Sequence, residues 1–304
     1  MLAGRLYRRL VHVKTQRVRF IFGSSPHSRY AMSDIQEHTL RSVAAFYDNV
    51  VAVEIFMGSN IHMGYWPAGA GGRLSEAQDR LTDLVGTASG AGEGTHLLDI
   101  GCGVGGPALR LTRMLGSTVT GISVSPAEVA AAQARTIDEG LRAQADFQVA
   151  DALSLPFADA TFDAAIAIES IVHISDKVRA LREIHRVLRP GATLVIADVT
   201  LREPDEVVGL EPLDLPVFNI LALQTHNEYR DLVAAAGFEL NHVEDLSNQT
   251  HPFYALCKQR VANRRAELEA VAGREQAAAL EDLLGLFEAT KQVGYILMVA
   301  NKPD

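Results

Sequence analysis

A glycine-rich turn between a short apolar segment and a helix-forming segment constrains the fold of this chain more than any other feature. Residues 97–106 read LLDIGCGVGG, with glycines at positions 101, 103 and 106. Glycine lets the backbone approach a ligand closely, and the N–H groups at the start of the following helix favour an anionic group. The segment predicts a strand–turn–helix unit that binds a ligand at the carboxyl end of its strand.

Apolar and amphipathic segments alternate along the chain after this turn. We expect strands at 97–100, 119–124, 146–149, 162–168, 193–199, 239–246 and 295–300, and helices at 107–115, 126–140, 177–188 and 227–236. The helix at 177–188 should stop at Arg189-Pro190-Gly191, because proline cannot continue a helix and glycine supplies a turn. Alternating strands and helices form βαβ units, so the sequence predicts an α/β fold with a mostly parallel sheet and helices on both faces.

The predicted organisation has three parts. They are a basic N-terminal arm at 1–33, a helical cap with an aromatic loop at 34–94, and the α/β domain at 95–304 with lid insertions at about 201–226 and 250–290. Further helical stretches are expected at 36–56, 74–88 and 252–290. Apolar residues in the two insertions either contact an apolar substrate or seal a homo-oligomer interface, and the sequence leaves both uses open.

Charge and composition exclude several classes of protein. The net charge of −9 leaves no dominant basic face for a nucleic acid. No apolar run approaches the roughly 18 residues of a membrane span. Cys102 and Cys257 have no further ligand at metal spacing, which is typical of reduced thiols in a cytoplasmic protein. We therefore expect a cytoplasmic protein without a metal site, a membrane span or a nucleic-acid partner.

The first 33 residues have an unusual composition, because they contain seven Arg and Lys residues and no Asp or Glu. Charges interrupt every apolar run there, which argues against a secretory signal. Three interpretations stay open. The segment is a transit peptide, an extension before a true start at Met32, or an arm that docks a neighbouring subunit or places Arg17 and Arg19 near an anionic substrate.

Three polar residues indicate what the glycine-rich turn binds. Asp99 lies two residues before Gly101, where its carboxylate can accept a hydrogen bond from an ammonium group. Ser123 ends the next strand, where a nicotinamide enzyme places Asp or Glu for its ribose. Asp151 follows the third strand, where it can accept a bond from an adenine amino group. A nicotinamide oxidoreductase shares the glycine spacing and is the runner-up, but Ser123 disfavours it.

Four motifs occur in one order along residues 95–200. They are Asp99-Ile-Gly-Cys-Gly-Val-Gly, Asp151-Ala-Leu-Ser-Leu-Pro-Phe, Phe162-Asp163-Ala and Leu188-Arg-Pro-Gly. In this order they resemble the signatures of class I S-adenosylmethionine (SAM)-dependent methyltransferases. The loop His62-Met-Gly-Tyr-Trp and the run Gly121-Ile-Ser-Val-Ser resemble those of natural-product members, including rebeccamycin-type sugar O-methyltransferases and terpenoid C-methyltransferases.

The resemblance implies a Rossmann-like, seven-stranded sheet whose last strand, at 295–300, is antiparallel, and SAM as the cofactor. It assigns Asp99, Gly101 and Gly103 to the methionine part of SAM, Ile122, Ser123 and Gln133 to the ribose and adenine, Asp151 and Ala152 to the adenine edge, and Tyr47, Tyr65 and Trp66 to a cover over the cofactor. Many relatives have an acidic residue at the position of Ser123. Ribose binding is therefore expected to be weaker here or to be shared with Gln133.

The segment 168–174 should face the methyl group and bears on the type of reaction. The sugar O-methyltransferases that this chain resembles have a His-His pair where it has Val172 and His173. The loss of one histidine leaves an apolar wall of Ile168, Ile171, Val172 and Ile174.

Glu169 lies in the same segment. It either takes a proton from a carbocation or only orients SAM or a neighbouring helix. We expect C-methylation of an isoprenoid double bond in a small apolar or prenylated substrate, with Glu169 and His173 as catalytic residues. The alternative is O-methylation of a sugar or phenol hydroxyl. Binding of a diphosphate stays open, as does a SAM-binding scaffold without catalysis.

Overall fold

The computed structural model describes residues 50–58, 60–68, 70–202, 223–290 and 293–304. The predicted basic arm, Tyr47 and most of the first lid insertion lie outside these residues. Within the described residues, no helix is both long and apolar enough to cross a membrane.

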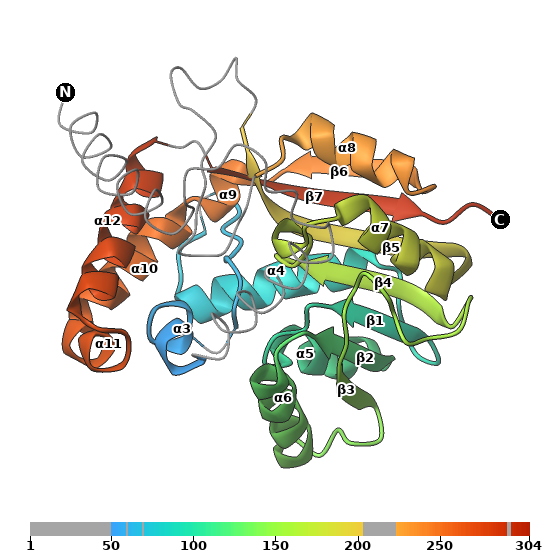
Figure 1. Cartoon of the computed structure of the whole chain (residues 1–304), viewed down its shortest axis with the longest axis horizontal. Helices are drawn as coiled ribbons and strands as arrows, with labels where there is room; N and C mark the ends of the chain where they lie inside the picture. The colour runs from blue at the N-terminus through green and yellow to red at the C-terminus, as the bar shows by residue number, and fades with distance from the viewer. Residues whose placement is uncertain (1–49, 59, 69, 203–222, 291–292) are drawn as a thin grey trace, which may run out of the picture. The chain divides into compact units, whose positions relative to one another are not determined.

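A seven-stranded sheet runs through the described residues in the order β3-β2-β1-β4-β5-β7-β6 (Figure 1). The strands are β1 His96–Ile100, β2 Thr118–Ser123, β3 Ala145–Val149, β4 Phe162–Ile168, β5 Leu188–Leu201, β6 Glu239–Asp245 and β7 Val293–Asn301. Strands β1 to β5 run parallel, and β7 runs antiparallel to both β5 and β6. This order confirms the predicted Rossmann-like sheet with an antiparallel last strand.

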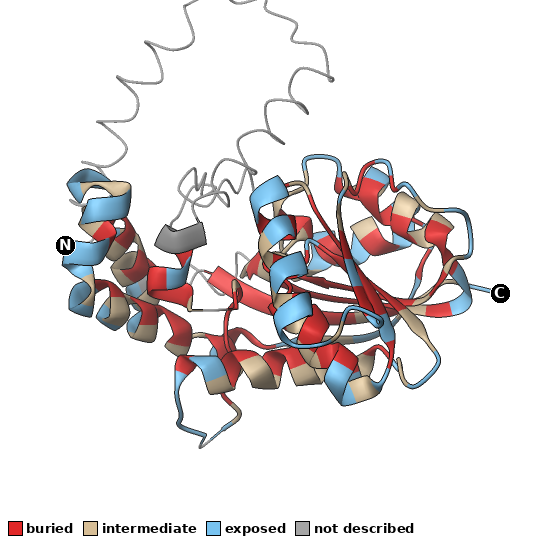
Figure 2. Cartoon of the chain, turned by 90° about the horizontal axis from the view of Figure 1, so that it is seen from below, coloured by how far each residue is buried: buried red, intermediate tan, exposed pale blue. Residues whose placement is uncertain are grey.

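Helices cover both faces of the sheet because its central strands are apolar on both sides. In β1, Leu97 belongs to the core cluster of one face and Leu98 to that of the other, and both are fully buried. Figure 2 shows that buried residues follow the strands and the sides of the helices that face them. One face is covered by α4 Leu74–Ala88, α5 Gly106–Leu115 and α6 Pro126–Asp138, and the other by α7 Lys177–Val187 and α8 His226–Ala235.

The boundary between α7 and β5 corrects the prediction of a helix to residue 188 and a strand from 193. Helix α7 ends at Val187, and the segment Arg189-Pro190-Gly191 lies inside β5. The tail after β7 holds this segment, because Lys302 Nζ donates to the Leu188 carbonyl (2.8 Å) and Gly191 N donates to the Lys302 carbonyl (2.9 Å). These contacts join residues more than a hundred positions apart, so local sequence could not reveal them.

A helical subdomain lies beside the sheet and contains the second predicted insertion (Figure 1). It consists of α3 Val50–Met57, α9 Ser247–Thr250, α10 Pro252–Asn263, α11 Arg265–Ala272 and α12 Arg274–Thr290. The expected helical stretch at 252–290 is thus divided into three helices, with one break at Gly273, where φ is +90°. Helix α10 packs against α3, where Arg260 Nε donates to the Phe56 carbonyl (3.0 Å).

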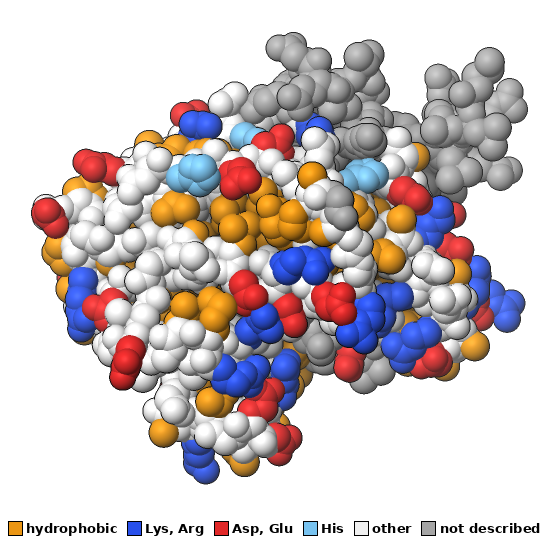
Figure 3. Space-filling view, turned by 180° about the vertical axis from the view of Figure 1, so that it is seen from behind, with side chains coloured by type: hydrophobic (Ala, Val, Ile, Leu, Met, Phe, Trp, Pro, Cys, Tyr) orange, Lys and Arg blue, Asp and Glu red, His pale blue; other side chains and the backbone are white. Residues whose placement is uncertain are grey.

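Ion pairs between helices account for part of the surface charge. Arg110 of α5 contacts Asp79 (3.1 Å) and Asp83 (2.6 Å) of α4, and Lys258 of α10 contacts Glu288 of α12 (3.0 Å). Figure 3 shows acidic and basic side chains interspersed over one face of the molecule. Exposed pairs of this kind contribute roughly 0–1 kcal/mol each, so the two apolar core clusters supply most of the stability.

Candidate active site

The carboxyl ends of β1, β2, β3 and β4 surround a cavity of about 850 Å³ that is open to solvent. A second pocket of about 320 Å³ adjoins it and shares Ile61, Gly101, Gly103 and Ile168 with it. Of the predicted site residues, Gly101, Gly103, Ile122, Ser123, Asp151, Ala152, Glu169 and His173 line the larger cavity, and Asp99, Gly101 and Gly103 line the smaller pocket.

The turn after β1 requires glycine at position 101. Its backbone has φ +74°, and a Cβ atom there would lie 2.4 Å from the Cβ of Ser170. The N–H groups of Gly101 and Cys102 both donate to the Ile122 carbonyl at 2.9 Å, which ties the turn to the end of β2. The turn therefore approaches the segment after β4 more closely than a residue with a side chain at position 101 would allow.

Asp99 is a buried carboxyl group that lacks one hydrogen-bond partner. Its side chain is 2% exposed, and its Oδ2 atom has no hydrogen-bond partner among the described residues. Burial raises the pKa of Asp99 to about 7, because the charged form loses its hydration. An ammonium group in the smaller pocket would supply both the missing donor and the missing positive charge. The residues present are therefore suited to the amino-acid end of SAM.

Glu128 is a site residue that the sequence analysis missed. It lies in the first turn of α6, is 5% exposed and lines the cavity, and its Oε2 accepts a hydrogen bond from Ser123 Oγ (2.6 Å). The acidic side chain that is missing at position 123 is thus supplied by Glu128, five residues later in the sequence. The N-cap Ser125 was the available signal, because it begins α6 at the cavity and directs the helix's first turn toward β2.

Gln133 is placed away from the cavity. Its Nε2 atom donates to the Phe147 carbonyl (2.8 Å), so the amide joins α6 to β3. Gln133 is not among the residues that line either cavity. Glu128 rather than Gln133 accompanies Ser123 in the cavity lining, and the sharing of ribose contacts between Ser123 and Gln133 stays a prediction.

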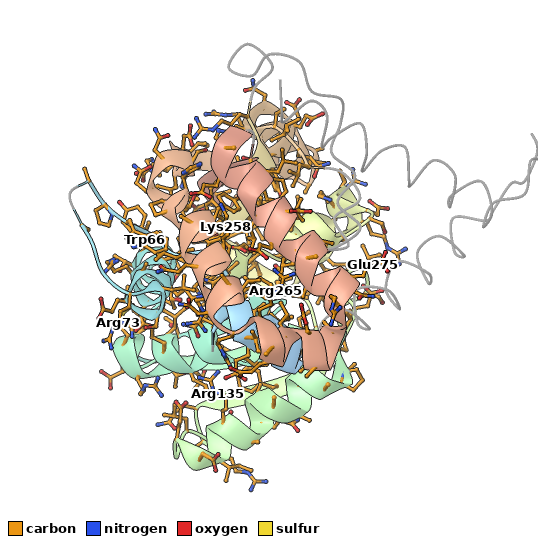
Figure 4. The ribbon with its side chains drawn as sticks, turned by 90° about the vertical axis from the view of Figure 1, so that its left-hand side faces the viewer. Trp66, Arg73, Arg135, Lys258, Arg265 and Glu275 are labelled. Carbon is orange, nitrogen blue, oxygen red and sulfur yellow. The ribbon has the colours of Figure 1, made fainter. Side chains whose placement is uncertain are left out.

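The aromatic loop also approaches the site differently from the expectation. Trp66, which is labelled in Figure 4, is 6% exposed. It packs against Gly64, where a Cβ would lie 2.6 Å from both the indole and Ala77 of α4. Neither Tyr65 nor Trp66 is among the residues that line the two cavities. Ile61 and His62 line them instead, and the covering role of Tyr65 and Trp66 stays a prediction.

A single amide fixes the path of this loop. Gln78 of α4 is 1% exposed, and its Nε2 atom lies 2.9, 2.7 and 2.8 Å from the carbonyl oxygens of Met57, Asn60 and His62. Burial lowers the pKa of His62 to about 4, so this imidazole is neutral at physiological pH. The loop is therefore a preformed wall of the site.

Glu169 joins the loop to the sheet. It adopts a left-handed conformation (φ +49°) directly after β4. Its Oε1 atom accepts hydrogen bonds from Met63 N (2.6 Å) and from the hydroxyl of Tyr295 in β7 (3.0 Å). Burial raises the pKa of Glu169 to about 8, although the Met63 and Tyr295 hydrogen bonds oppose this shift. The Oε1 atom of Glu169 thus joins the loop to β7, and a part of Glu169 in catalysis or in orienting SAM or a neighbouring helix stays a prediction.

His173 lies in the segment after β4 and lines the larger cavity. It ends the short 3₁₀ helix η1 Ile171–His173, and Ser170 and Ile174 line the same cavity. The predicted apolar wall is only partly present. Ile168 and Ile174 line the cavity, whereas Ile171 and Val172 are buried in the cores of opposite faces of the sheet.

Comparisons with known proteins find relatives along most of the chain. The family described as "Methyltransferase domain" matches residues 98–196. Methyltransferase GfsG of Streptomyces halstedii is 35% identical over 86% of this chain and 95% of its own length. The 27-O-demethylrifamycin SV methyltransferase of Amycolatopsis mediterranei is 36% identical over 81% of this chain and 91% of its own length. Among solved structures, the [4+2]-cyclase SpnF has a TM-score of 0.78 and 33% identity, over 87% of this chain and 97% of that chain.

Proposed function

This chain belongs to the class I SAM-dependent methyltransferases of natural-product metabolism, and we propose that it methylates a hydroxyl group of a small apolar metabolite, with His173 as the general base. The observation that carries the proposal is the contrast between two neighbouring side chains. His173 lines the same cavity as the proposed cofactor residues, whereas the Oε1 atom of Glu169 already accepts two hydrogen bonds.

The cofactor residues are proposed from the same geometry. Asp99 would accept hydrogen bonds from the ammonium group, and the turn at Gly101 and Gly103 would let the backbone approach the methionine part. Ser123 and Glu128 would contact the ribose hydroxyls, and Asp151 with Ala152 would contact the adenine edge. When bound, SAM supplies an electrophilic methyl group on a positively charged sulfur.

The residues around His173 would align the acceptor and remove its proton. A hydroxyl group is a weak nucleophile, and a base within hydrogen-bond reach removes its proton as the new O–C bond forms and the C–S bond breaks. A ring nitrogen of His173 would receive that proton. Ile168 and Ile174 form an apolar lining that favours an apolar acceptor and excludes water.

Two observations favour oxygen over carbon as the acceptor atom. C-methylation through a carbocation would use the carboxylate of Glu169 as the base, but its Oε1 atom is engaged by Met63 and Tyr295. The name of the Amycolatopsis relative also refers to a methylated oxygen. C-methylation of an isoprenoid double bond is the second candidate, because Glu169 still lines the cavity. A homo-oligomeric state and a prenylated acceptor remain predictions.

The test compares variants of the two candidate bases with methyl-labelled SAM and a panel of hydroxylated, glycosylated and prenylated metabolites. We expect His173→Ala to lower kcat by about a hundredfold or more, in line with the loss of a general base. Glu169→Gln, which keeps the size of the side chain, should change kcat far less. His242→Ala, at an exposed position in β6, is the control. The reverse result, with Glu169→Gln inactive and His173→Ala active, would contradict the proposal.

A further inference from the structure

A buried polar cluster lies behind the turn that carries His173. It consists of Lys177 at the start of α7, Asp198 in β5 and Tyr229 in α8. Asp198 and Tyr229 are fully buried, and Lys177 is 9% exposed. None of the three is among the residues that line the two cavities, so none is placed to touch the acceptor or the cofactor.

The cluster binds the backbone on both sides of His173. Lys177 Nζ donates to the carbonyls of Ile174 (2.8 Å) and Val172 (3.3 Å). Val172 N donates to Asp198 Oδ2 (2.8 Å), and the Tyr229 hydroxyl donates to the same oxygen (2.8 Å). The residue before His173 is thus held through its N–H and its carbonyl, and the residue after it is held through its carbonyl.

The η1 turn has little support of its own. A 3₁₀ turn has poorer hydrogen-bond geometry than an α-helix, and this one is three residues long. Its internal hydrogen bonds run from His173 N to the Ser170 carbonyl (3.2 Å) and from Ile174 N to the Ile171 carbonyl (3.0 Å). The position of the imidazole therefore depends on contacts from outside the turn.

Filling this space with polar side chains also costs free energy. Burying an ammonium and a carboxylate costs hydration energy, and well-packed apolar side chains of similar volume often stabilise a core better. The polar atoms of the cluster nevertheless have partners, because the ammonium donates to two carbonyls of the turn, the Tyr229 hydroxyl donates to Asp198, and Asp198 also accepts from Val199 N (2.9 Å). Hydrogen bonds reach this turn from α7 and β5, and Tyr229 of α8 supports the Asp198 carboxylate, which indicates that the exact geometry of the turn matters.

We propose that Lys177 and Tyr229 are positioning residues, which hold the η1 turn so that the His173 imidazole meets the acceptor hydroxyl. Asp198 links Tyr229 to the turn, because its Oδ2 atom accepts from both the Tyr229 hydroxyl and Val172 N. This inference rests on the proposed function, because it gives the cluster a purpose only if His173 acts as the base. A displacement of about 1 Å at a reacting group costs up to about a hundredfold in rate, so the loss of either contact should be visible in kcat.

The first test is a kinetic double-mutant cycle. Lys177→Met and Tyr229→Phe should each lower kcat by about tenfold or more. The Kd of S-adenosylhomocysteine should stay within about twofold, because Asp99 and Gly101 lie outside the cluster. Combined with His173→Ala, each change should cause almost no further loss. Arg179→Met, on the exposed side of the same helix, should behave as wild type. Full kcat in both single variants, or additive losses, would overturn the proposal.

The second test does not depend on activity. Hydrogen–deuterium exchange of a peptide covering 168–176 should be at least about tenfold faster in Lys177→Met, whereas a peptide covering 97–106 should exchange as in wild type. Tyr229→Phe, which keeps the ring in the core, gives the same readout if Lys177→Met does not fold. Unchanged exchange at 168–176 would overturn the proposal. Full activity of His173→Ala would contradict the proposed function, and with it the positioning role, even if exchange is fast in Lys177→Met. Unchanged exchange with an inactive His173→Ala would overturn the positioning role alone.

Discussion

Asp99 is the residue whose environment most directly predicts a cationic ligand. Its pKa lies near 7 because it is buried without a donor for Oδ2. An ammonium group beside it would lower that pKa, so ligand binding at pH 6 should release close to one proton from a carboxyl that is mostly protonated beforehand. Asp99→Asn should abolish this release and weaken binding of S-adenosylhomocysteine by about tenfold or more.

Calorimetry in two buffers of different ionisation enthalpy measures both quantities. Asp138→Asn, an exposed position at the end of α6, is the matched control and should behave as wild type. Equal proton release by wild type and Asp99→Asn would show that Asp99 does not meet the ammonium group.

Substitutions of Glu128 and Gln133 are expected to have different effects, although both residues lie on α6. Glu128→Ala should weaken SAM binding by about tenfold, since hydrogen bonds to charged groups contribute about 1.5–3 kcal/mol. Gln133→Ala should leave the Kd within about twofold and lower the melting temperature instead, because it leaves the Phe147 carbonyl without its donor. Titration calorimetry and thermal melts separate the two effects. A larger loss of affinity in Gln133→Ala would restore the role that the sequence first suggested.

At the scale of elements, the aromatic loop depends on α4. Gln78→Met removes the donor that lies near three loop carbonyls and keeps a side chain of similar length. Unsatisfied buried carbonyls cost about 1–3 kcal/mol each. We therefore expect a melting temperature lower by several degrees and weaker SAM binding, because Ile61 and His62 line the site. Gln144→Met, at an exposed position, should change neither quantity. A loss of stability without a loss of affinity would mean that the loop does not shape the site.

The elements that could be predicted from the sequence are those whose signals are local. The apolar runs of β1 and β4 and the glycine at position 101 act within a few residues, and the structure confirms the strand–turn–helix unit that they predict. The early start of β5 could not be predicted, because Lys302 holds it from the far end of the chain. Gly273 is a helix-breaking residue in the sequence, but the apolar residues throughout 252–290 favoured the prediction of one helical stretch.

The site residues divide in the same way. Asp99, Gly101 and Asp151 follow directly from strand ends, and they line the cavities as expected. The placement of Trp66, whose backbone N–H donates to the Gln249 carbonyl (2.9 Å), and the engagement of Glu169 by Tyr295 depend on partners that are distant in sequence. Local pattern thus predicts residues that line the cavity, whereas the contacts that engage Glu169 come only with the fold.

At the scale of the whole molecule, buried carboxyl groups make stability depend on pH. Burial raises the pKa of Asp99 to about 7 and that of Glu169 to about 8. Because the folded pKa values lie above the unfolded ones, this contribution is complete below about pH 4 and is lost as pH rises through the folded values. Between pH 6 and 8 the melting temperature of the cofactor-free protein should therefore fall. Thermal melts of the Asp99→Asn, Glu169→Gln double variant should show a flatter profile, and an equally steep fall would contradict these shifts.

The central claim is that this methyltransferase transfers its methyl group to an oxygen atom. The most direct measurement is two-dimensional NMR of the product formed from SAM that carries a ¹³C-labelled methyl group. We predict that the label correlates with a carbon atom across an ether oxygen, and that His173→Ala forms little of this product. A label bonded directly to a carbon atom of the acceptor would contradict the claim and establish C-methylation in its place.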